Sequence, residues 1–466
     1  MPDRLRKKLL PVLLVVSFSG GKTTAQVMKL KEVVNLAIEN YPLIQAKRSY
    51  VNASKAAVEQ TKRDYLPNVS VAAQQDYGTV NGQNGPLYGF GGLGTASSGP
   101  ALPSQNWNSA FGALYLSNVN WDFFAFGRVK QRVNVARAIQ ERDQLDLDQE
   151  LFQQKVRVSA AYLNLLAAKR LTLTQQRNLG RAVTFKNTAV VRAANGLIAG
   201  VDSSLAAAEV SNARISLNRA IEFEQEQANR LALLLGKEAT DISPDTASFS
   251  RLPVKFYENR LLAENEHPLL KFYRQRVQVS ESQENYFRKF YYPTFSLFGV
   301  AQGRGSGFSD HYVLDQSAFT RNYFTGVNPV RGNYLLGIGV SWNLTSILRS
   351  GSQVRSQKFT TEGLRHEYEL ADVQLKGQLD LADKRIRTSM ASYAEAPVQV
   401  KAASDAYLQK TTLYRNGLTT LVDLTQTLYT LNRAETDRDI AYTNVWQALL
   451  LKSAALGDFS IFIDEF

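Results

Sequence analysis

The chain is 466 residues long, with 54 lysines and arginines against 42 aspartates and glutamates, three histidines and no cysteine. The absence of cysteine excludes disulfides, zinc-thiolate sites and a cysteine nucleophile. The histidines lie in unrelated contexts, and no carboxylate pair or nucleophile motif has a supporting context, so we expect neither an enzyme nor a metal or cofactor site. The net charge of +12 coincides with no aromatic-rich recognition module, so nucleic acid is not an expected partner.

The N-terminal segment 1–25 has the pattern of an export signal. Four basic residues within positions 4–8 precede a mainly apolar run of ten residues at 9–18. Small residues end at Ala25, so that cleavage would leave Gln26 first. A short membrane anchor is the alternative interpretation. Removal of the signal leaves 49 basic and 41 acidic residues, a net charge of +8. No later stretch has the eighteen consecutive apolar residues of a transmembrane helix, so we expect a periplasmic, secreted or β-structured outer-membrane protein.

The remaining sequence contains an internal repeat. Two landmarks recur at an offset of 226 residues, since 40–43 (NYPL) corresponds to 266–269 (EHPL) and 65–67 (YLP) to 291–293 (YYP). Two more recur at an offset of 221, since Trp121 corresponds to Trp342 and 196–202 (GLIAGVD) to 417–423 (GLTTLVD). Four landmarks in one order at nearly one spacing indicate two copies of one structural unit.

Each copy predicts the same elements in the same order. The first repeat, 26–258, is expected to hold a helix over about 30–65, strands over about 68–77 and 109–121, a long helical hairpin over 129–236 and a linker over 237–258. The second repeat, 259–456, is expected to hold a helix over about 261–292, strands over about 294–302 and 333–342, and a hairpin over 352–456 with a kink at Pro397. Residues 457–466 are expected to form a C-terminal tail.

The last predicted strand has the clearest pattern. Large apolar residues at 334, 336, 338, 340 and 342 alternate with small or polar ones, which suits a strand with lipid on one face and a lumen on the other. An ordinary sheet with one core face is the alternative. Aromatic residues near strand ends, Trp121, Tyr334 and Trp342, match a membrane-interface girdle. Four strands per chain cannot close a membrane barrel, whereas three chains together would supply twelve.

Together these features resemble the TolC-like outer-membrane efflux protein family, the outer membrane factors. The resemblance rests on the signal, the repeat, the landmarks above, the segment 121–128 (WDFFAFGR) and the two Gly-Leu hairpin tips. It implies an α+β membrane protein: a homotrimeric channel-tunnel whose shared 12-stranded antiparallel barrel lies in the outer-membrane lipid of a Gram-negative bacterium and continues into a periplasmic α-helical coiled-coil barrel. It further implies passive conduction of small molecules and drugs, driven by an inner-membrane transporter of RND or ABC type and bridged by a periplasmic adaptor (membrane fusion) protein.

The resemblance also implies two groups of site residues at the hairpin tips. Asp202, Asp423 and Tyr414 match positions that constrict the closed periplasmic aperture; this chain has Gln426 where some relatives have a second acid and Thr419 where some have a basic residue. The pairs Gly196-Leu197 and Gly417-Leu418 match the tips where relatives dock their adaptor. As alternatives, the two aspartates are helix N-caps and the Gly-Leu pairs are ordinary helix-turn signals.

Two other functions remain open at this stage. A type I protein secretion duct would need the same channel, so the sequence does not separate it from small-molecule efflux. A non-transporting periplasmic coiled-coil tether would share the long helices without needing lipid. Membrane fractionation would distinguish this tether from a channel.

Overall fold

The computed structural model describes residues 26–82, 100–237, 242–245, 252–253 and 267–466. These residues form two compact units, each assembled from separate stretches of the chain. The first unit combines residues up to 46 with 149–267 and 373–466, and the second combines 47–148 with 268–372. The predicted cleavage residue Ala25 lies outside the described residues, whereas Gln26 begins the short strand β1 (Gln26–Met28), which pairs in parallel with β4 (Ile242–Pro244).

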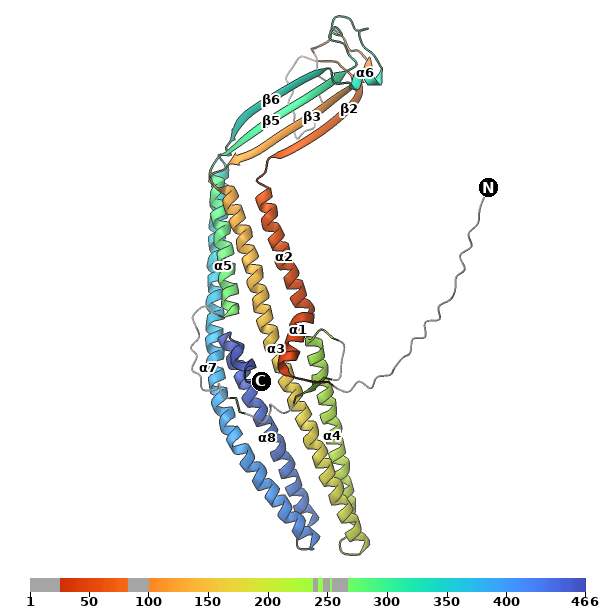
Figure 1. Cartoon of the computed structure of the whole chain (residues 1–466), viewed down its shortest axis with the longest axis vertical. Helices are drawn as coiled ribbons and strands as arrows, with labels where there is room; N and C mark the ends of the chain where they lie inside the picture. Colours follow the sequence, from red (N-terminus) through yellow and green to blue (C-terminus); the bar gives the residue numbers. More distant parts are fainter. Residues whose placement is uncertain (1–25, 83–99, 238–241, 246–251, 254–266) are drawn as a thin grey trace, which may run out of the picture. The chain divides into compact units, whose positions relative to one another are not determined.

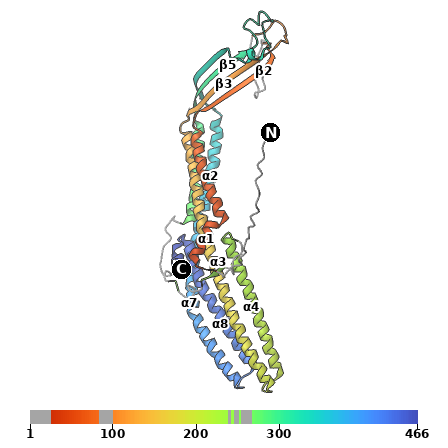
Figure 2. The same cartoon turned by 45° about the vertical axis from the view of Figure 1, so that its right-hand side comes forward.

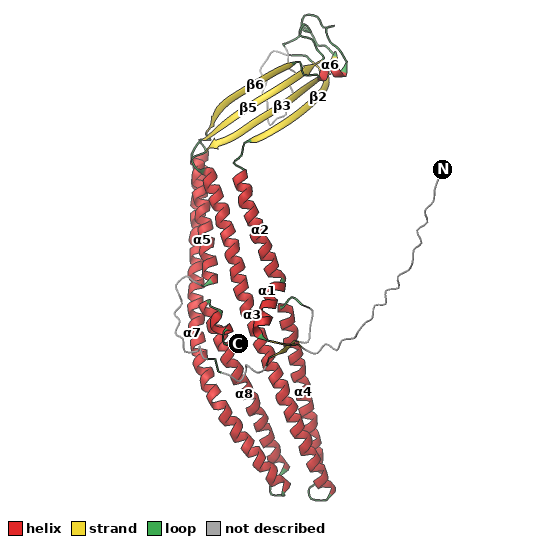
Figure 3. Cartoon of the chain, viewed as in Figure 1, coloured by secondary structure: helices red, strands yellow, loops and turns green. Residues whose placement is uncertain are grey.

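A single antiparallel sheet dominates the second unit (Figure 3). Its order is β2 (Asn68–Thr79), β3 (Ser109–Phe124), β5 (Thr294–Ser306) and β6 (Arg331–Ser341). Each of the four strands overlaps the range predicted from the sequence, and β2, β3 and β5 extend further. The two repeats meet at the centre of the sheet, where β3 pairs with β5. Strands β2 and β6 are therefore its edges, and each has a neighbour on one side within the chain.

The strand register divides the sheet into two chemically different faces, because directly paired residues point to the same side. We call one side the apolar face; its members are Val69, Val71, Ala73, Gln75, Tyr77, Phe111, Ala113, Tyr115, Ser117, Val119, Trp121, Phe295, Leu297, Gly299, Ala301, Gly303, Tyr334, Leu336, Ile338 and Val340. The other side, the polar face, includes Ser70, Gln74, Asp76, Asn118, Asn120, Ser296, Gln302, Arg304, Arg331 and Asn333 together with Leu114, Leu116, Phe298, Val300 and Leu335.

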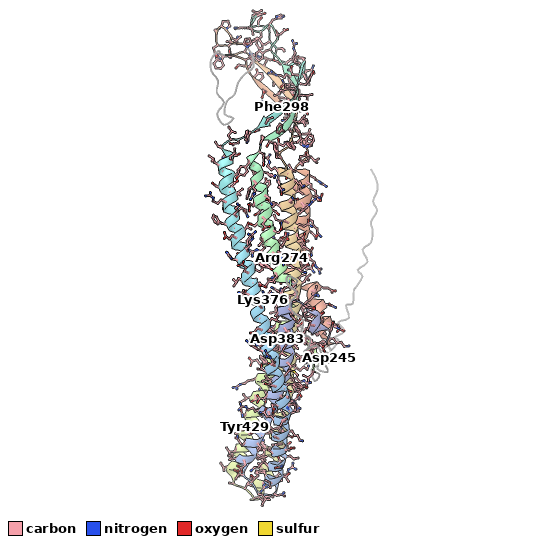
Figure 4. The ribbon with its side chains drawn as sticks, turned by 90° about the vertical axis from the view of Figure 1, so that its left-hand side faces the viewer. Asp245, Arg274, Phe298, Lys376, Asp383 and Tyr429 are labelled. Atoms are coloured by element: carbon pink, nitrogen blue, oxygen red, sulfur yellow. The ribbon has the colours of Figure 1, made fainter. Side chains whose placement is uncertain are left out.

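Small residues on the polar face make room for one large ring. A Cβ added at Gly337 would lie 2.5 Å from the ring of Phe298, which is the directly paired residue on β5 and is labelled in Figure 4. The alternation of large and small residues in the sequence of β6 therefore has a packing reason at Gly337.

The same hydrogen bond closes the strand-to-helix junction in both repeats. Trp121 Nε1 donates to the carbonyl oxygen of Tyr65 at 2.8 Å, and Trp342 Nε1 donates to that of Tyr291 at 3.2 Å. In each case the acceptor lies two residues before the proline that ends the preceding helical segment. The equivalence inferred from sequence offsets is thus repeated in the geometry.

Long helices follow the strands. They are α1 (Leu30–Asn40), α2 (Pro42–Arg63), α3 (Arg128–Ala194), α4 (Gly200–Leu234), α5 (Pro268–Phe287), α7 (Ser346–Arg415) and α8 (Leu421–Leu456). Pro42 separates α1 from α2, and Pro397 lies inside the continuous α7. The part of the predicted helix at 261–266 lies outside the described residues. None of the described helices combines the length and apolar character needed to cross a membrane.

In the first unit the helices form two hairpins, α3 with α4 and α7 with α8, whose partners run side by side in Figures 1 and 2. Their apolar core joins α1, α3, α4 and α8 around the fully buried Tyr162, Leu231 and Leu449. The residues expected to form a tail belong to this core instead. The short helix α9 (Ser460–Ile463) carries Phe462, which is fully buried, and the Phe466 ring lies 4.5 Å from the Trp446 ring at a tilt of 52°. The apolar content of the segment IFIDEF explains this, because its burial outweighs the entropy of a free end.

Candidate functional site

The two hairpin tips are built by the same backbone turn. Gly196 and Gly417 have φ of +71° and +79°, values that favour glycine. The amide of the following leucine bonds five residues back, Leu197 to the Arg192 carbonyl and Leu418 to the Leu413 carbonyl, each at 2.9 Å. This is the Schellman ending of a helix, so the helix-turn interpretation of the Gly-Leu pairs is confirmed.

Both leucines at the tips face solvent. Leu197 is 65 % exposed and Leu418 is 71 % exposed. In a Schellman ending the apolar residue at this place often packs back onto its own helix. The turn itself therefore does not explain why Leu197 and Leu418 are exposed. Each hairpin tip presents one large apolar side chain to solvent.

The aspartates lie at equivalent positions but not at the helix ends. Ala199 is the N-cap of α4 and Thr420 is the N-cap of α8, so Asp202 and Asp423 each occupy the third helical residue. The N-cap interpretation of the two aspartates is therefore wrong. The cause is that each helix begins two residues before its aspartate. In this first turn a carboxylate still interacts favourably with the positive end of the helix dipole.

Asp423 is held in a small polar network at the second tip. Its Oδ2 accepts a hydrogen bond from Thr419 Oγ1 at 2.9 Å and lies 3.7 Å from Lys410 Nζ, which itself donates to Thr419 Oγ1 at 3.3 Å. The hydroxyl of Thr419, that of Thr420 and the charge of Lys410 lower the pKa of the Asp423 carboxyl. The carboxylate is exposed and ionised, and its charge is partly balanced from within the chain. Gln426, one turn further along α8, is exposed as well.

Tyr414 has a different location from the exposed aspartate. Its side chain is 3 % exposed, within a cluster that includes Phe185 of α3, Ala206 of α4 and Leu424 of α8. Its hydroxyl has no hydrogen-bond partner among the described residues, and burial raises the pKa of this phenol. In this structure the ring therefore packs between the two hairpins and is not presented at an exposed aperture surface.

Arg192 is a site residue that the sequence analysis missed. Its guanidinium lies 5.1 Å from the centre of the Tyr414 ring and donates to the carbonyl oxygens of Tyr414 and Arg415, the latter at 2.9 Å. These carbonyls belong to the last turn of α7, and that of Tyr414 also accepts from the Gly417 amide at 3.0 Å. Arg192 thus binds the end of the second hairpin from the first. One signal in the sequence could have found it. Arg192 lies four residues before the turn glycine Gly196, in the last turn of its helix, where a positive charge interacts favourably with the helix dipole.

Further polar contacts join the two hairpins away from the tips. Arg181 of α3 makes a two-pronged ion pair with Glu435 of α8, at 3.2 and 2.7 Å, and both side chains are largely buried. Tyr429 of α8, labelled in Figure 4, donates to the Glu209 carboxylate of α4. Because removing one member of a buried pair leaves an uncompensated charge, these links specify how the hairpins align.

The remaining predicted residues, those of the membrane interface, are distributed over the sheet. Trp121 and Trp342 close the strand-to-helix junctions described above, and Tyr334 is 83 % exposed near the start of β6. All four residues of β6 that alternate with small ones, from Tyr334 to Val340, are exposed in the single chain. A large uncovered apolar surface of this kind needs a nonaqueous neighbour or a partner.

Comparison with known proteins finds one matching family model. Residues 33–237 match the family model described as outer membrane efflux protein. This match covers less than half of the chain, and it shows that residues 33–237 resemble the family. Its members are outer membrane channels that conduct passively, so the chain is not an enzyme. No sequence among the curated proteins matches the chain.

Solved structures of outer membrane channels share the whole fold. The outer membrane protein VceC of Vibrio cholerae is 17 % identical with a TM-score of 0.72, covering 92 % of this chain and 96 % of its own. CusC, described with transmembrane channel formation, is 13 % identical with a TM-score of 0.75, covering 98 % and 99 %. The Campylobacter jejuni channel CmeC is 13 % identical with a TM-score of 0.71, covering 98 % and 94 %. At these identities the likeness establishes the fold, that of channel-tunnels with four strands per chain.

Proposed function

We propose that this protein is the outer-membrane channel of a tripartite efflux system, which conducts small molecules and drugs passively from the periplasm to the exterior. The observation that carries the proposal is the two-faced sheet with two open edges. Its apolar face suits lipid and its polar face suits a water-filled lumen. In lipid, the backbone groups at the edges β2 and β6 have to be paired by other copies of the chain.

A homotrimer satisfies this requirement. Three copies of four strands give twelve, an even number in a closed ring, with β6 of each copy adding to β2 of the next. Exposed apolar side chains on α4, Val201, Leu205 and Ile215, have the spacing of a coiled-coil seam and offer a second contact between neighbouring copies. The helices then form a coiled-coil barrel in the periplasm.

The hairpin tips serve two roles in this proposal. Asp202 and Asp423 form rings of like charge at the periplasmic aperture, with Thr419 and Gln426 beside them and Tyr414 setting the hairpin packing behind them. Gly196-Leu197 and Gly417-Leu418 dock the periplasmic adaptor, which links the channel to an inner-membrane transporter of RND or ABC type. The exposure of both leucines supports docking, since each offers an apolar side chain on a rigid turn.

The test is transport in cells. Deletion of the gene should raise intracellular accumulation of efflux substrates, and the wild-type chain should restore efflux. The double substitution Leu197→Ser and Leu418→Ser should fail to restore it while the trimer still forms in the outer membrane. Recovery of the protein from the soluble periplasm without detergent would overturn the channel proposal, as would unchanged accumulation after deletion for every efflux substrate tested.

A further inference from the structure

The connection between β5 and β6 folds over the apolar face of the sheet. Within it lies the short helix α6 (Tyr323–Val327), seen in Figure 1 at the end of the sheet opposite to the helix junctions. We call residues 320–330 the rim segment. The hydroxyl of Tyr115, which belongs to the apolar face, donates to the Val327 carbonyl at 3.1 Å, and the Tyr323 ring lies edge-on to Phe111 at 5.2 Å.

Glycines fix the side of the sheet on which the rim segment lies. A Cβ added at Gly305 would meet the carbonyl oxygens of Asn328 and Gly326 at 2.7 Å, and one at Gly303 would meet Pro329 at 3.3 Å. Gly303 and Gly305 pair with Tyr115 and Ala113, so the directions of their Cβ atoms are those of the apolar face. Within the proposed barrel this face is the outer wall, so the rim segment lies outside the pore.

The rim segment also forms a hydrogen bond with the one amide side chain of the apolar face, Gln75. Gln75 Oε1 accepts from the Tyr323 hydroxyl at 2.8 Å, and Gln75 Nε2 donates to the Tyr115 hydroxyl at 3.3 Å. An amide left bare toward lipid would cost several kcal/mol. Satisfying it from the rim segment makes this part of the wall compatible with a nonaqueous surrounding.

Several backbone amides of the rim segment are paired within the chain, as a structure against lipid requires. Asn322 caps α6 by accepting from the Thr325 amide at 3.1 Å, and the Gly326 and Asn328 amides bond the carbonyls of Asn322 and Phe324 at 3.0 and 3.1 Å. The Val330 amide bonds the Arg304 carbonyl at 2.9 Å. Two large apolar side chains of the segment are exposed, Phe324 at 78 % and Val330 at 65 %, next to exposed polar residues that include Arg321.

We propose that the rim segment is a lipid-contacting collar, docked on the outer wall of the barrel and occupied on its free side by lipid of the outer leaflet. The inference rests on the proposed function, since it uses the assignment of the apolar face to the membrane. The docking of the segment on that face, with the large apolar side chains of Phe324 and Val330 left exposed, is the observation behind it. The exposed Arg321, whose guanidinium lies 5.8 Å from the centre of the Phe319 ring, supplies a cation for lipid phosphate. As a consequence, this connection does not act as a lid over the channel exit.

The absence of cysteine permits a clean test by site-directed spin labelling of the full chain in lipid vesicles. Single cysteines replace Phe324 and Val330 in the rim segment, Ile338 on the apolar face, Leu335 on the polar face and Leu314, which is 89 % exposed in the same connection. Each label is scored by its collision rate with oxygen, which concentrates in lipid, relative to that with a nickel chelate, which stays in water.

We expect the oxygen-to-nickel ratio at Phe324→Cys and Val330→Cys to match Ile338→Cys and to exceed Leu314→Cys and Leu335→Cys severalfold. A water-like ratio at both rim positions with a lipid-like ratio at Ile338→Cys would overturn the collar and leave the channel standing. Equal ratios at Ile338→Cys and Leu335→Cys would overturn the membrane assignment of the sheet, and with it both proposals.

Discussion

Arg192, in the last turn of α3, donates a hydrogen bond of 2.9 Å to the carbonyl oxygen of Arg415, the last residue of α7. The two residues are 223 positions apart and belong to different repeats. Through this contact the first hairpin holds the end of the second, a few residues from the aspartates proposed to line the aperture.

Arg192→Ala should loosen the closed aperture. The substitution removes hydrogen bonds from a charged group to two helix-end carbonyls, each worth about 1.5–3 kcal/mol, and the cation–π contact with Tyr414. We expect a higher resting conductance in planar bilayers. Arg415→Ala is the matched control, because it removes the same charge from an exposed side chain at the same helix end. Equal resting conductance in the wild type and Arg192→Ala would show that the contact of Arg192 with the end of α7 does not keep the aperture closed.

Block of the channel by cations should depend on Asp423, and its strength should change when Lys410 or Thr419 is replaced. Asp423→Asn is expected to abolish block by a multivalent cation added from the tip side, whereas Lys410→Met should strengthen it by removing the balancing charge 3.7 Å away. Block measured in single-channel records tests both. Weaker block in Lys410→Met would contradict the network described here.

The pH dependence of this block has a predicted direction. Hydrogen bonds from Thr419 and Thr420 lower the pKa of Asp423, so the wild-type carboxylate stays charged, and block persists, below the ordinary aspartate range. Thr419→Val removes the largest cause and should move the loss of block to higher pH. A titration of block with the same midpoint in both proteins would disprove the assignment.

His267 should make the stability of the first unit fall in mild acid. Burial lowers the pKa of its imidazole, which bonds the Ala454 carbonyl at 3.0 Å. The unfolded chain therefore binds more protons, so stability is retained above the ordinary histidine pKa of about 6.5 and is lost as the pH falls below it. Thermal unfolding at about pH 7.5 and about pH 5 checks this. His267→Gln should lose part of the pH dependence, whereas replacement of the exposed His366 should lose less.

Two glycines near the ends of α4 should respond oppositely to alanine. Gly236 has φ of +65°, and a Cβ there would lie 2.8 Å from the Asn40 carbonyl oxygen, so Gly236→Ala should destabilise the fold by roughly 1–3 kcal/mol. Gly200 is helical with open space around it, so Gly200→Ala should be neutral or stabilising by up to about 1 kcal/mol. Thermal unfolding of both variants tests the pair; a larger loss at Gly200 would contradict the backbone argument.

The sequence by itself determined the elements and their twofold repetition. Prolines at 42, 67 and 293 and glycines at 196 and 417 act on their own backbone, so they mark boundaries without knowledge of the fold. Alternation along β6 likewise predicts a two-faced strand, because a period of two is a local property. The N-cap interpretation of Asp202 would start α4 three residues too late, since the observed N-cap, Ala199, has no side chain that could mark the helix start in the sequence.

Only the tertiary structure decided which residues from the two repeats meet. The burial of Tyr414, its contact with Arg192 and the pairing of Lys410 with Asp423 depend on how hairpins pack in three dimensions. The path of the rim segment across the apolar face depends in turn on glycines opposite backbone atoms far along the chain. Local propensity carries no information on such contacts, because they are fixed by the burial of surfaces that become neighbours only on folding.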